Sequence, residues 1–246
     1  MYIKSRACAV MQPTYLPWLG YFDLIVNVND FHFLDDVKFN KSSYHHQNKI
    51  LSSNGDIFLS VPTHAIKGRM NSMIKDVKID KSKNWKKKQL KSIEQSYRKA
   101  PYFNNIFDKV ESVLLSDIDK LSKLNIMLIK LFSSMLNVKT NFHLTSQMKN
   151  LTDNKVQRLL DICQSRECNY YYSPKGSLDY LDTVENKALF EEFGISIYFQ
   201  EFKMIPYQQN QKEFVPYMSI LDALMYCGAE GTRDLIQKGG YMSRLT

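Results

Sequence analysis

The sequence predicts an α/β fold, and three observations support this prediction. An apolar run at 7–10 precedes an apolar-periodic segment at 19–28 and a second apolar run at 31–34, the pattern of a strand, a helix and a strand. Strand and helix patterns alternate again after residue 141. The region 83–140 shows helical periodicity alone. We therefore expect a Rossmann-like mixed sheet with a parallel β-α-β start, plus a helical flank or insertion.

The turn after the first strand is the leading candidate for a ligand site. Pro13 and Pro17 exclude regular structure there, because each fixes φ and lacks an amide hydrogen. Gln12, Tyr15 and Trp18 then project from the turn and offer an amide, a phenol and an indole. Open α/β sheets bind ligands in the crevice beyond the carboxyl ends of their strands. The turn stands at such an end.

Asp35 and Asp36 follow the second predicted strand. A strand-helix-strand unit implies parallel pairing with a right-handed crossover, which brings both aspartates to the same sheet edge as the turn. In a loop, either carboxylate could hold a substrate amine, bind Mg²⁺ or act as a general base. The alternative is a structural role, as a helix cap or in a salt bridge with Lys38 or Lys41.

Bulk composition indicates a globular protein. The chain has 246 residues, 44% of them hydrophobic and 24% charged, which are ordinary values for a chain with a packed core. We expect one compact domain in three parts: an N-terminal α/β part with the site at 1–82, a helical hairpin region at 83–140 and a C-terminal α/β part at 141–246.

Charge and cysteine content narrow the function classes. The net charge of +8 favours anionic partners, but no nucleic-acid motif accompanies it, so nucleic acid is an unlikely partner. The 4 Cys lack the paired spacing of a zinc site and are expected to be free thiols. No signal peptide or membrane-length apolar segment is visible, so we expect a cytoplasmic location and no membrane span.

The middle of the chain adds a hairpin and helices. A turn at 53–56 joins strand patterns at 44–51 and 57–61. Lys67, Gly68 and Arg69 form a basic loop that suits phosphate, although such loops are usually solvated. A short strand or sheet edge is expected at 74–79. Helices are expected at 83–98, 101–114 and 117–136. Lysines on the first of these indicate an exposed face rather than an anion site.

The last third repeats the strand-helix alternation. A helix capped by Asp153 or Asn154 leads to a strand at 169–172 and a turn at 173–177 that could cradle an anion with backbone amides, although it is no Walker motif. A helix at 184–193 and a strand at 195–199 follow. A final helix is expected from Ser219 to Gly228, and the tail at 239–246 is expected to be loosely held.

The histidines give weaker signals than the aspartates. His45 and His46 are adjacent, so their side chains diverge on a strand, and no third ligand follows at metal-binding spacing. We therefore expect no metal site here, and we expect one of these two histidines to face the candidate ligand site. His32 and His143 lie on apolar segments and are expected to be structural.

Several motifs together resemble the WbqC-like protein family over nearly the whole chain. They lie at 12–22, 33–39, 48–50, 59–62, 97–103, 172–176, 207–208 and 219–222. The resemblance implies a bacterial enzyme of surface-polysaccharide biosynthesis (O-antigen, lipopolysaccharide) that acts on a sugar nucleotide, often an amino sugar, or on its acyl donor. This chain departs from the family pattern at two positions, where Met11 and Gln89 replace histidines.

Together these observations predict a transferase that modifies a nucleotide-linked amino sugar by acyl or aminoacyl transfer to the sugar amine, with ATP or an acyl donor as candidate co-substrate. Such chemistry needs a base for the ammonium and donors for the oxyanion. The alternative is a non-catalytic binder of nucleotide sugar or carbohydrate in a glycan-assembly complex. The catalytic candidates are Asp35, Asp36 and Gln12. The substrate-binding candidates are Tyr15, Trp18, Lys38, Tyr44, His46, Asn48, Ser173, Lys175, Tyr207 and Gln208.

Overall fold

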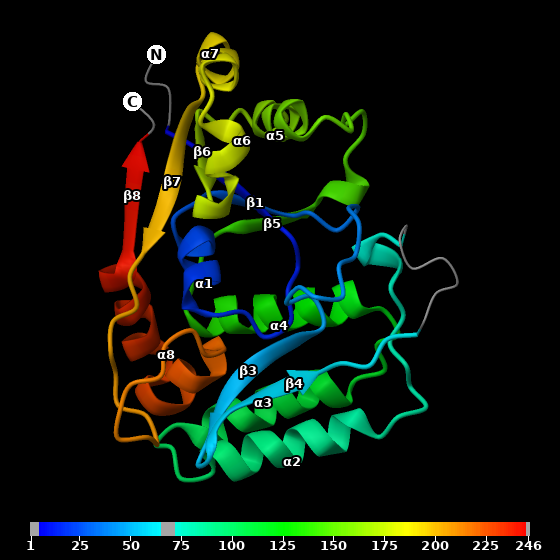
Figure 1. The fold of residues 1–246 in the computed structure, drawn as a ribbon, viewed down its shortest axis with the longest axis vertical. Coiled ribbons are helices and arrows are strands. Elements are labelled where there is room, and N and C mark those ends of the chain that lie inside the picture. The colour runs from blue at the N-terminus through cyan, green and yellow to red at the C-terminus, as the bar shows by residue number, and fades with distance from the viewer. Residues whose placement is uncertain (1–4, 65–71, 245–246) are drawn as a thin grey trace.

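A six-stranded sheet forms the centre of the α/β part of the molecule in the computed structural model, which describes residues 5–64 and 72–244 (Figure 1). The strand order is β5-β2-β1-β6-β7-β8, and all neighbours are parallel except β8, which is antiparallel to β7. The mixed α/β fold is therefore confirmed. The basic loop residues Lys67, Gly68 and Arg69 lie outside the described residues. The strands of the sheet are β1 (Ala7–Met11), β2 (Asp30–Phe33), β5 (Asn141–Leu144), β6 (Tyr170–Ser173), β7 (Ser196–Phe202) and β8 (Gly240–Arg244).

The predicted parallel unit is present. β1 and β2 pair in parallel from Cys8↔Asp30 to Met11↔Phe33, and α1 (Leu19–Val26) connects them. The chain then moves outward from β2 to β5 before it returns to β6 on the other side of β1. This reversal of strand order makes the carboxyl ends of β1 and β6 the topological switch point, where open α/β sheets bind ligands.

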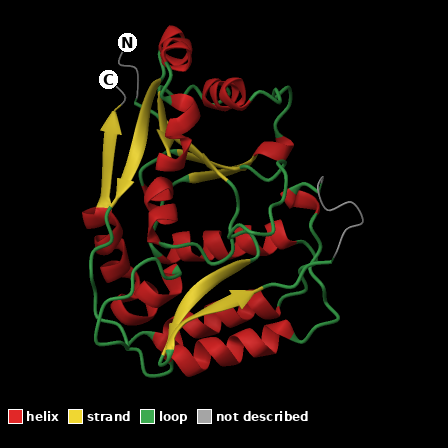
Figure 2. Cartoon of the chain, viewed as in Figure 1, coloured by secondary structure: helices red, strands yellow, loops and turns green. Residues whose placement is uncertain are grey.

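Helices cover both faces of the sheet (Figure 2). The alternation of side chains along β1 assigns the faces, because successive residues of a strand point to opposite sides. Ala9 belongs to a large core with α1, α4 and α8, whereas Cys8 and Val10 belong to a smaller core with α5 and α7. The helices are α2 (Trp85–Tyr97), α3 (Phe103–Leu115), α4 (Leu121–Met135), α5 (Lys155–Gln164), α6 (Leu178–Leu181), α7 (Val184–Glu192) and α8 (Ile220–Gly239).

The helical region consists of α2, α3 and α4, and the β3–β4 hairpin lies beside them (Figure 1). β3 (Gln47–Ser52) and β4 (Gly55–Ser60) pair antiparallel, as the turn signal predicts, and Gly55 takes a φ of +111° that favours glycine. The helix predicted at 117–136 is α4, and it begins at Leu121. The residues before it are extended, because Ile79 N–H donates to the carbonyl of Asp119 and Lys120 forms a backbone bridge with Lys78.

Two further expectations were wrong, and a third was incomplete. The tail expected to be loose forms β8, which is held by backbone pairing with β7 and needs no apolar pattern. The segment at 74–79 contains a 3₁₀ turn, Ile74–Asp76, and isolated bridges in place of a strand. The last predicted helix is interrupted at Gly228, where φ is +67° and the backbone is not helical, but a second helical stretch that was not predicted follows it and extends α8 to Gly239.

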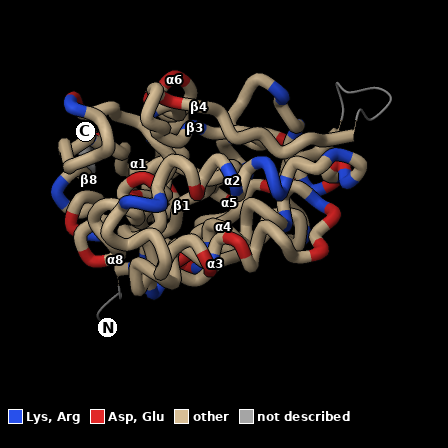
Figure 3. Tube along the Cα trace, turned by 90° about the horizontal axis from the view of Figure 1, so that it is seen from below, with Lys and Arg blue, Asp and Glu red and all other residues tan. Residues whose placement is uncertain are grey.

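Charged residues lie around the outside of the molecule, with basic and acidic segments interspersed (Figure 3). The net charge of +8 is therefore spread over several elements. Among residues 5–64 and 72–244, no helix has both the length and the hydropathy that crossing a bilayer requires.

His32 on β2 gives the fold a testable pH dependence. Its side chain is fully buried, and neither ring nitrogen has a hydrogen-bond partner among the described residues. Burial lowers the pKa of His32 to about 3. An unfolded histidine titrates near pH 6.5, so the unfolded state binds more protons below that pH and the free energy of unfolding falls as the pH falls.

We expect His32→Leu to remove this contribution, which is about 2 kcal/mol between about pH 6.5 and pH 5. Urea unfolding of the wild type and the variant at both pH values measures it. His64→Leu, at an exposed position, is the matched control and should retain the wild-type dependence. Equal pH dependence in the wild type and His32→Leu would contradict the assignment.

Candidate functional site

The turn after β1 is held in place by side-chain amides from distant elements. Asn125 of α4 donates from Nδ2 to the carbonyl of Pro13 (3.0 Å) and to that of His45 (2.7 Å). Asn48 of β3 donates to the carbonyl of Leu16 (2.8 Å). Both asparagines are buried, so each bond satisfies a carbonyl that water does not reach freely.

The turn also carries backbone strain. Leu16 has a φ of +43°, a conformation that residues with a side chain rarely adopt. Pro17 follows it, and the Pro17 carbonyl accepts a hydrogen bond from Ile220 N–H (2.8 Å), at the start of α8. Tyr217, just before that helix, has a φ of +61°. Strained residues persist only where their surroundings fix them, and such residues cluster at ligand sites.

A cavity of about 320 Å³ opens beside the turn, and we call it the Trp18 cavity. Its size is at the lower end of the range for small-molecule sites. Trp18 and Tyr217 lie 5.5 Å apart between ring centroids, with planes inclined by 60°. The tyrosine rings at its rim are largely exposed, Tyr44 at 54% and Tyr217 at 60%. The lining residues are Met11, Thr14, Pro17, Trp18, Tyr21, Tyr44, Asn48 and Tyr217.

Gln12 is oriented by His45. Nδ1 of His45 accepts a hydrogen bond from Asn40 N–H (3.3 Å), which leaves the proton of the neutral ring on Nε2. Nε2 lies 2.9 Å from Gln12 Oε1 and therefore donates to it. Burial lowers the pKa of His45 to about 4, so the ring is neutral at pH 7. The Gln12 amide NH₂ has no partner among the described residues and remains available as a donor.

Asp35 and Asp36 lie at the carboxyl end of β2, next to the end of β1. The Leu34 N–H donates to the carbonyl of Met11 (2.9 Å), so this segment continues alongside a residue that lines the Trp18 cavity. Asp35 is buried and accepts hydrogen bonds from Ser146 N–H (3.0 Å) and Ser146 Oγ (2.7 Å). The structure therefore places the aspartates at the predicted edge, with Asp35 already bonded to the segment after β5.

Asp36 has two internal partners. One oxygen accepts from Thr145 Oγ1 (2.6 Å) and the other from Arg158 of α5 (2.5 Å). Each carboxylate oxygen has two lone pairs, so both carboxylates keep acceptor capacity for a substrate ammonium. Among the described residues, no group of three His, Cys, Asp or Glu side chains could hold a metal ion.

Two predicted binding residues use their hydroxyl groups within the protein. Tyr15 is fully buried and donates its hydroxyl hydrogen to Gln89. Tyr207 is partly buried, and its hydroxyl donates to Asp222 (2.8 Å), a fully buried carboxylate whose pKa burial raises. Burial also raises the pKa of both phenols, which keeps them protonated donors. Both hydroxyl hydrogens are therefore already donated to internal acceptors.

The remaining predicted binding residues are scattered. Lys38, Lys175 and Gln208 are exposed and do not line the Trp18 cavity. His46 is buried, and burial lowers its pKa. Ser173 is fully buried at the end of β6, and its Oγ has no partner among the described residues. Of the predicted binding set, only Trp18, Tyr44 and Asn48 line the Trp18 cavity together.

Sequence reasoning missed several residues that shape the site. Asn125 and Tyr217 are absent from the predicted set, because nothing in their local sequence indicates a carbonyl clamp or a cavity rim. The structure also gives Gln89 a role in holding the turn. It accepts from Tyr15 and donates to the carbonyl of Ser60 (2.7 Å), which ties α2 to the turn and to β4.

Gly20 gives a test of the Trp18 cavity. A Cβ at this position would lie 2.3 Å from the Trp18 ring, so we expect Gly20→Ala to displace the indole even though alanine favours helices by about 0.5–1 kcal/mol. In a Trp85→Phe background the emission of Trp18 should shift to the red as the ring becomes solvated. Gly176→Ala, with no atom within 4 Å of the added Cβ, should leave the spectrum unchanged.

The two hydrogen bonds from Asn125 to the carbonyls of Pro13 and His45, which we call the Asn125 clamp, can be tested by mutation. Asn125→Leu keeps the branched shape of the side chain but leaves two carbonyls without a donor, at a cost of about 1–3 kcal/mol each. The free energy of unfolding should fall by about 2–4 kcal/mol in urea titrations. Asn105→Leu, at an exposed position of α3, is the control and should change it by less than about 0.5 kcal/mol. Similar values for the two variants would argue against the clamp.

Comparison with known proteins identifies the family of the chain. A protein of Mycobacterium tuberculosis named only as uncharacterized protein Rv1507c is 33% identical over 227 residues, which cover 92% of this chain and 95% of that protein. No solved structure matches the chain. The sequence model of the WbqC-like protein family matches residues 12–234, which include the turn, the aspartates and all residues lining the Trp18 cavity except Met11. The chain is a member of the WbqC-like protein family.

Proposed function

We propose that the protein is an enzyme of bacterial surface-polysaccharide biosynthesis that modifies a nucleotide-linked amino sugar, by acyl or aminoacyl transfer to the sugar amine. The observation that carries the proposal is the Trp18 cavity at the carboxyl end of β1. Its aromatic rings suit stacking on a sugar or a base, and Asn48 and Thr14 add polar groups to an otherwise apolar lining.

Gln12 supplies a donor beside the cavity. Its side-chain oxygen is bonded to His45, so the amide NH₂ is the available group, although Gln12 itself does not line the cavity. An oriented amide donor can stabilise the oxyanion that forms when an amine attacks an acyl carbonyl. Met11, its neighbour, lines the Trp18 cavity, which puts the backbone of Gln12 at the cavity edge.

Asp35 or Asp36 would hold the amine and accept its proton. An amine becomes a nucleophile only after it loses a proton, so a base must lie within hydrogen-bond reach. The internal bonds of both aspartates come from a serine, a threonine and an arginine, which leave acceptor capacity on each carboxylate. ATP or an acyl donor is the proposed co-substrate.

One observation favours a second candidate, a non-catalytic binder of nucleotide sugar or carbohydrate. All the carboxylate oxygens of Asp35 and Asp36 already accept internal hydrogen bonds. A purely structural role would account for these bonds, since they join the segment after β2 to the segment after β5 and to α5. In that case the Trp18 cavity binds the ligand and no group transfer follows.

A thermal-shift screen tests binding first. The probes are nucleotide-linked amino sugars and their N-acylated forms, with ATP and acyl-coenzyme A compounds. A ligand at 100 times its Kd raises the free energy of unfolding by about 2.7 kcal/mol. We expect Trp18→Ala to abolish this rise for the sugar nucleotide and Asp35→Asn to retain it.

Turnover then separates the two candidates. If the protein is an enzyme, the rate of product formation, measured by mass spectrometry, should fall by about a hundredfold or more in Asp35→Asn while the thermal shift is retained. Asp117→Asn, at an exposed carboxylate, is the matched control. A wild type that binds sugar nucleotide but forms no product with any donor supports the binder. A thermal shift that is unchanged in Trp18→Ala would overturn both candidates.

A further inference from the structure

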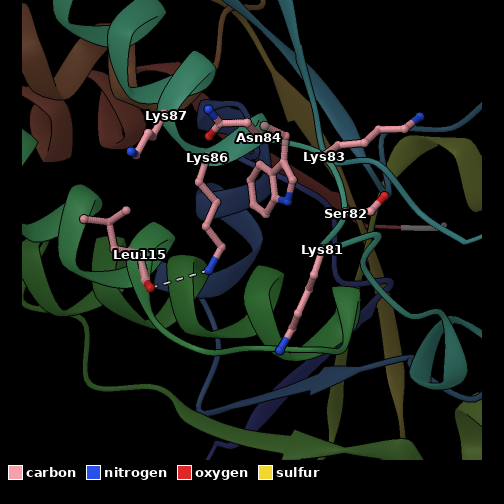
Figure 4. Close-up of a pocket in the computed structure, with 8 residues that line it drawn as sticks. Lys81, Ser82, Lys83, Asn84, Lys86, Lys87 and Leu115 are labelled. Carbon is pink, nitrogen blue, oxygen red and sulfur yellow. Dashed lines mark hydrogen bonds between the residues drawn. The ribbon is translucent and has the colours of Figure 1, made fainter.

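A second cavity lies at the start of α2 and shares no lining residue with the Trp18 cavity. It encloses about 400 Å³, and we call it the α2 cleft (Figure 4). Four of its eight lining side chains are lysines, and none is acidic. The lining residues are Lys81, Ser82, Lys83, Asn84, Trp85, Lys86, Lys87 and Leu115.

Two of the lysines are anchored and two have no partner. Lys81 forms an ion pair with Asp117 (2.5 Å), and Lys86 donates to the carbonyl of Ser116 (2.6 Å). In Figure 4, Lys86 reaches toward Leu115 across the cleft, whereas Lys83 and Lys87 extend to opposite sides. Lys83 and Lys87 are exposed, and their ammonium groups have no ion pair or hydrogen bond to any described residue. Their long side chains are therefore free to turn onto a bound anion.

The helix end within the cleft is uncapped. Asn84 stands at the N-cap position of α2, but its side chain makes no capping hydrogen bond. The first amides of a helix have no intrahelical acceptor, and they carry the positive end of the helix dipole. α2 has 13 residues, so the positive partial charge at its N-terminus is of ordinary size for a helix. This feature alone marks no site, because many helix ends are simply hydrated.

Trp85 provides the independent observation. Its side chain is only 6% exposed and it lines the cleft. Its indole N–H has no hydrogen-bond acceptor among the described residues. The indole nitrogen is not among the fully buried polar atoms of the described residues, so its N–H is a donor that a molecule in the lysine-lined cleft can reach. Lys86 Nζ lies 6.0 Å from the centroid of the Trp85 ring system.

Desolvation reinforces the preference for an anion. Burial lowers the pKa of Lys86, which shows that its ammonium is partly removed from water. An added negative charge would compensate that loss of hydration. The same charge would meet the unpartnered ammonium groups of Lys83 and Lys87, whereas the first amide of α2, that of Trp85, already donates to the carbonyl of Lys83 (2.8 Å).

We propose that the α2 cleft binds a phosphate-bearing ligand, with Lys83 and Lys87 as mobile cationic partners and the Trp85 indole N–H as a fixed donor. Oxygen acceptors that carry charge match the ammonium groups of Lys83 and Lys87 and the Trp85 indole N–H, since each of these groups is a donor. The site is separate from the proposed transferase site, so the two proposals stand or fall by different measurements.

Intrinsic fluorescence tests the α2 cleft directly, because the chain has only 2 Trp and Trp18→Phe leaves Trp85 alone. Inorganic pyrophosphate, titrated at about 0.15 M ionic strength where distant charges are screened, should produce a saturable change in Trp85 emission. Lys83→Ala with Lys87→Ala should raise the Kd about tenfold or more. Both lysines are exposed, so the double variant should fold with an unchanged thermal midpoint.

The matched control is Lys88→Ala with Lys91→Ala, which removes the same charge from exposed positions of α2 outside the cleft. It should change the Kd by less than about twofold. Equal weakening in the two double variants, or the absence of a saturable response, would overturn the proposal. Calorimetry on Trp85→Phe should show weaker pyrophosphate binding, and an unchanged Kd would remove the indole from the site.

A competition experiment identifies the source of the phosphate. Vesicles of phosphatidylcholine with phosphatidic acid are added to the pyrophosphate complex. Displacement that the control double variant retains supports a lipid headgroup as the ligand, and no displacement supports a soluble phosphorylated molecule. Both results retain the phosphate site.

Discussion

The parallel pairing of β1 with β2 is the constraint on which the site depends. It brings the carboxyl ends of both strands to one edge, and the bond from Leu34 N–H to Met11 continues the contact beyond the strands. The chain after β1 must then turn sharply into α1, and the turn containing Pro13 and Pro17 makes that change of direction. The Trp18 cavity and the two aspartates are consequences of this one geometry.

Buried polar side chains then fix what the backbone pairing leaves free. Asn48 and Asn125 come from the hairpin and the helical flank, and each replaces water as the donor to carbonyls of the turn and its neighbours. Such bonds contribute modestly to net stability but cost much when one partner is lost. They therefore define a single conformation for the turn, including the strained backbone of Leu16.

The sequence was sufficient to predict the local helices and strands named above, but it was insufficient to predict the side-chain contacts between them. The β-α-β unit and the hairpin follow from short-range patterns and were predicted correctly. Asn125 lies 112 residues from Pro13, and Arg158 lies 122 residues from Asp36, so no local pattern records these bonds. The strand β8 escaped prediction for a related reason: its pairing uses backbone groups, which every residue type supplies.

The carbonyls of the turn are bonded by groups from β3, α4 and α8, and the last of these donors is Ile220. A chain that stopped at α7 would contain both strands of the first parallel pair but would lack the Ile220 N–H that bonds the Pro17 carbonyl. The conformation of the turn therefore depends on both ends of the sequence, and the early α/β segment does not contain all the contacts that fix it.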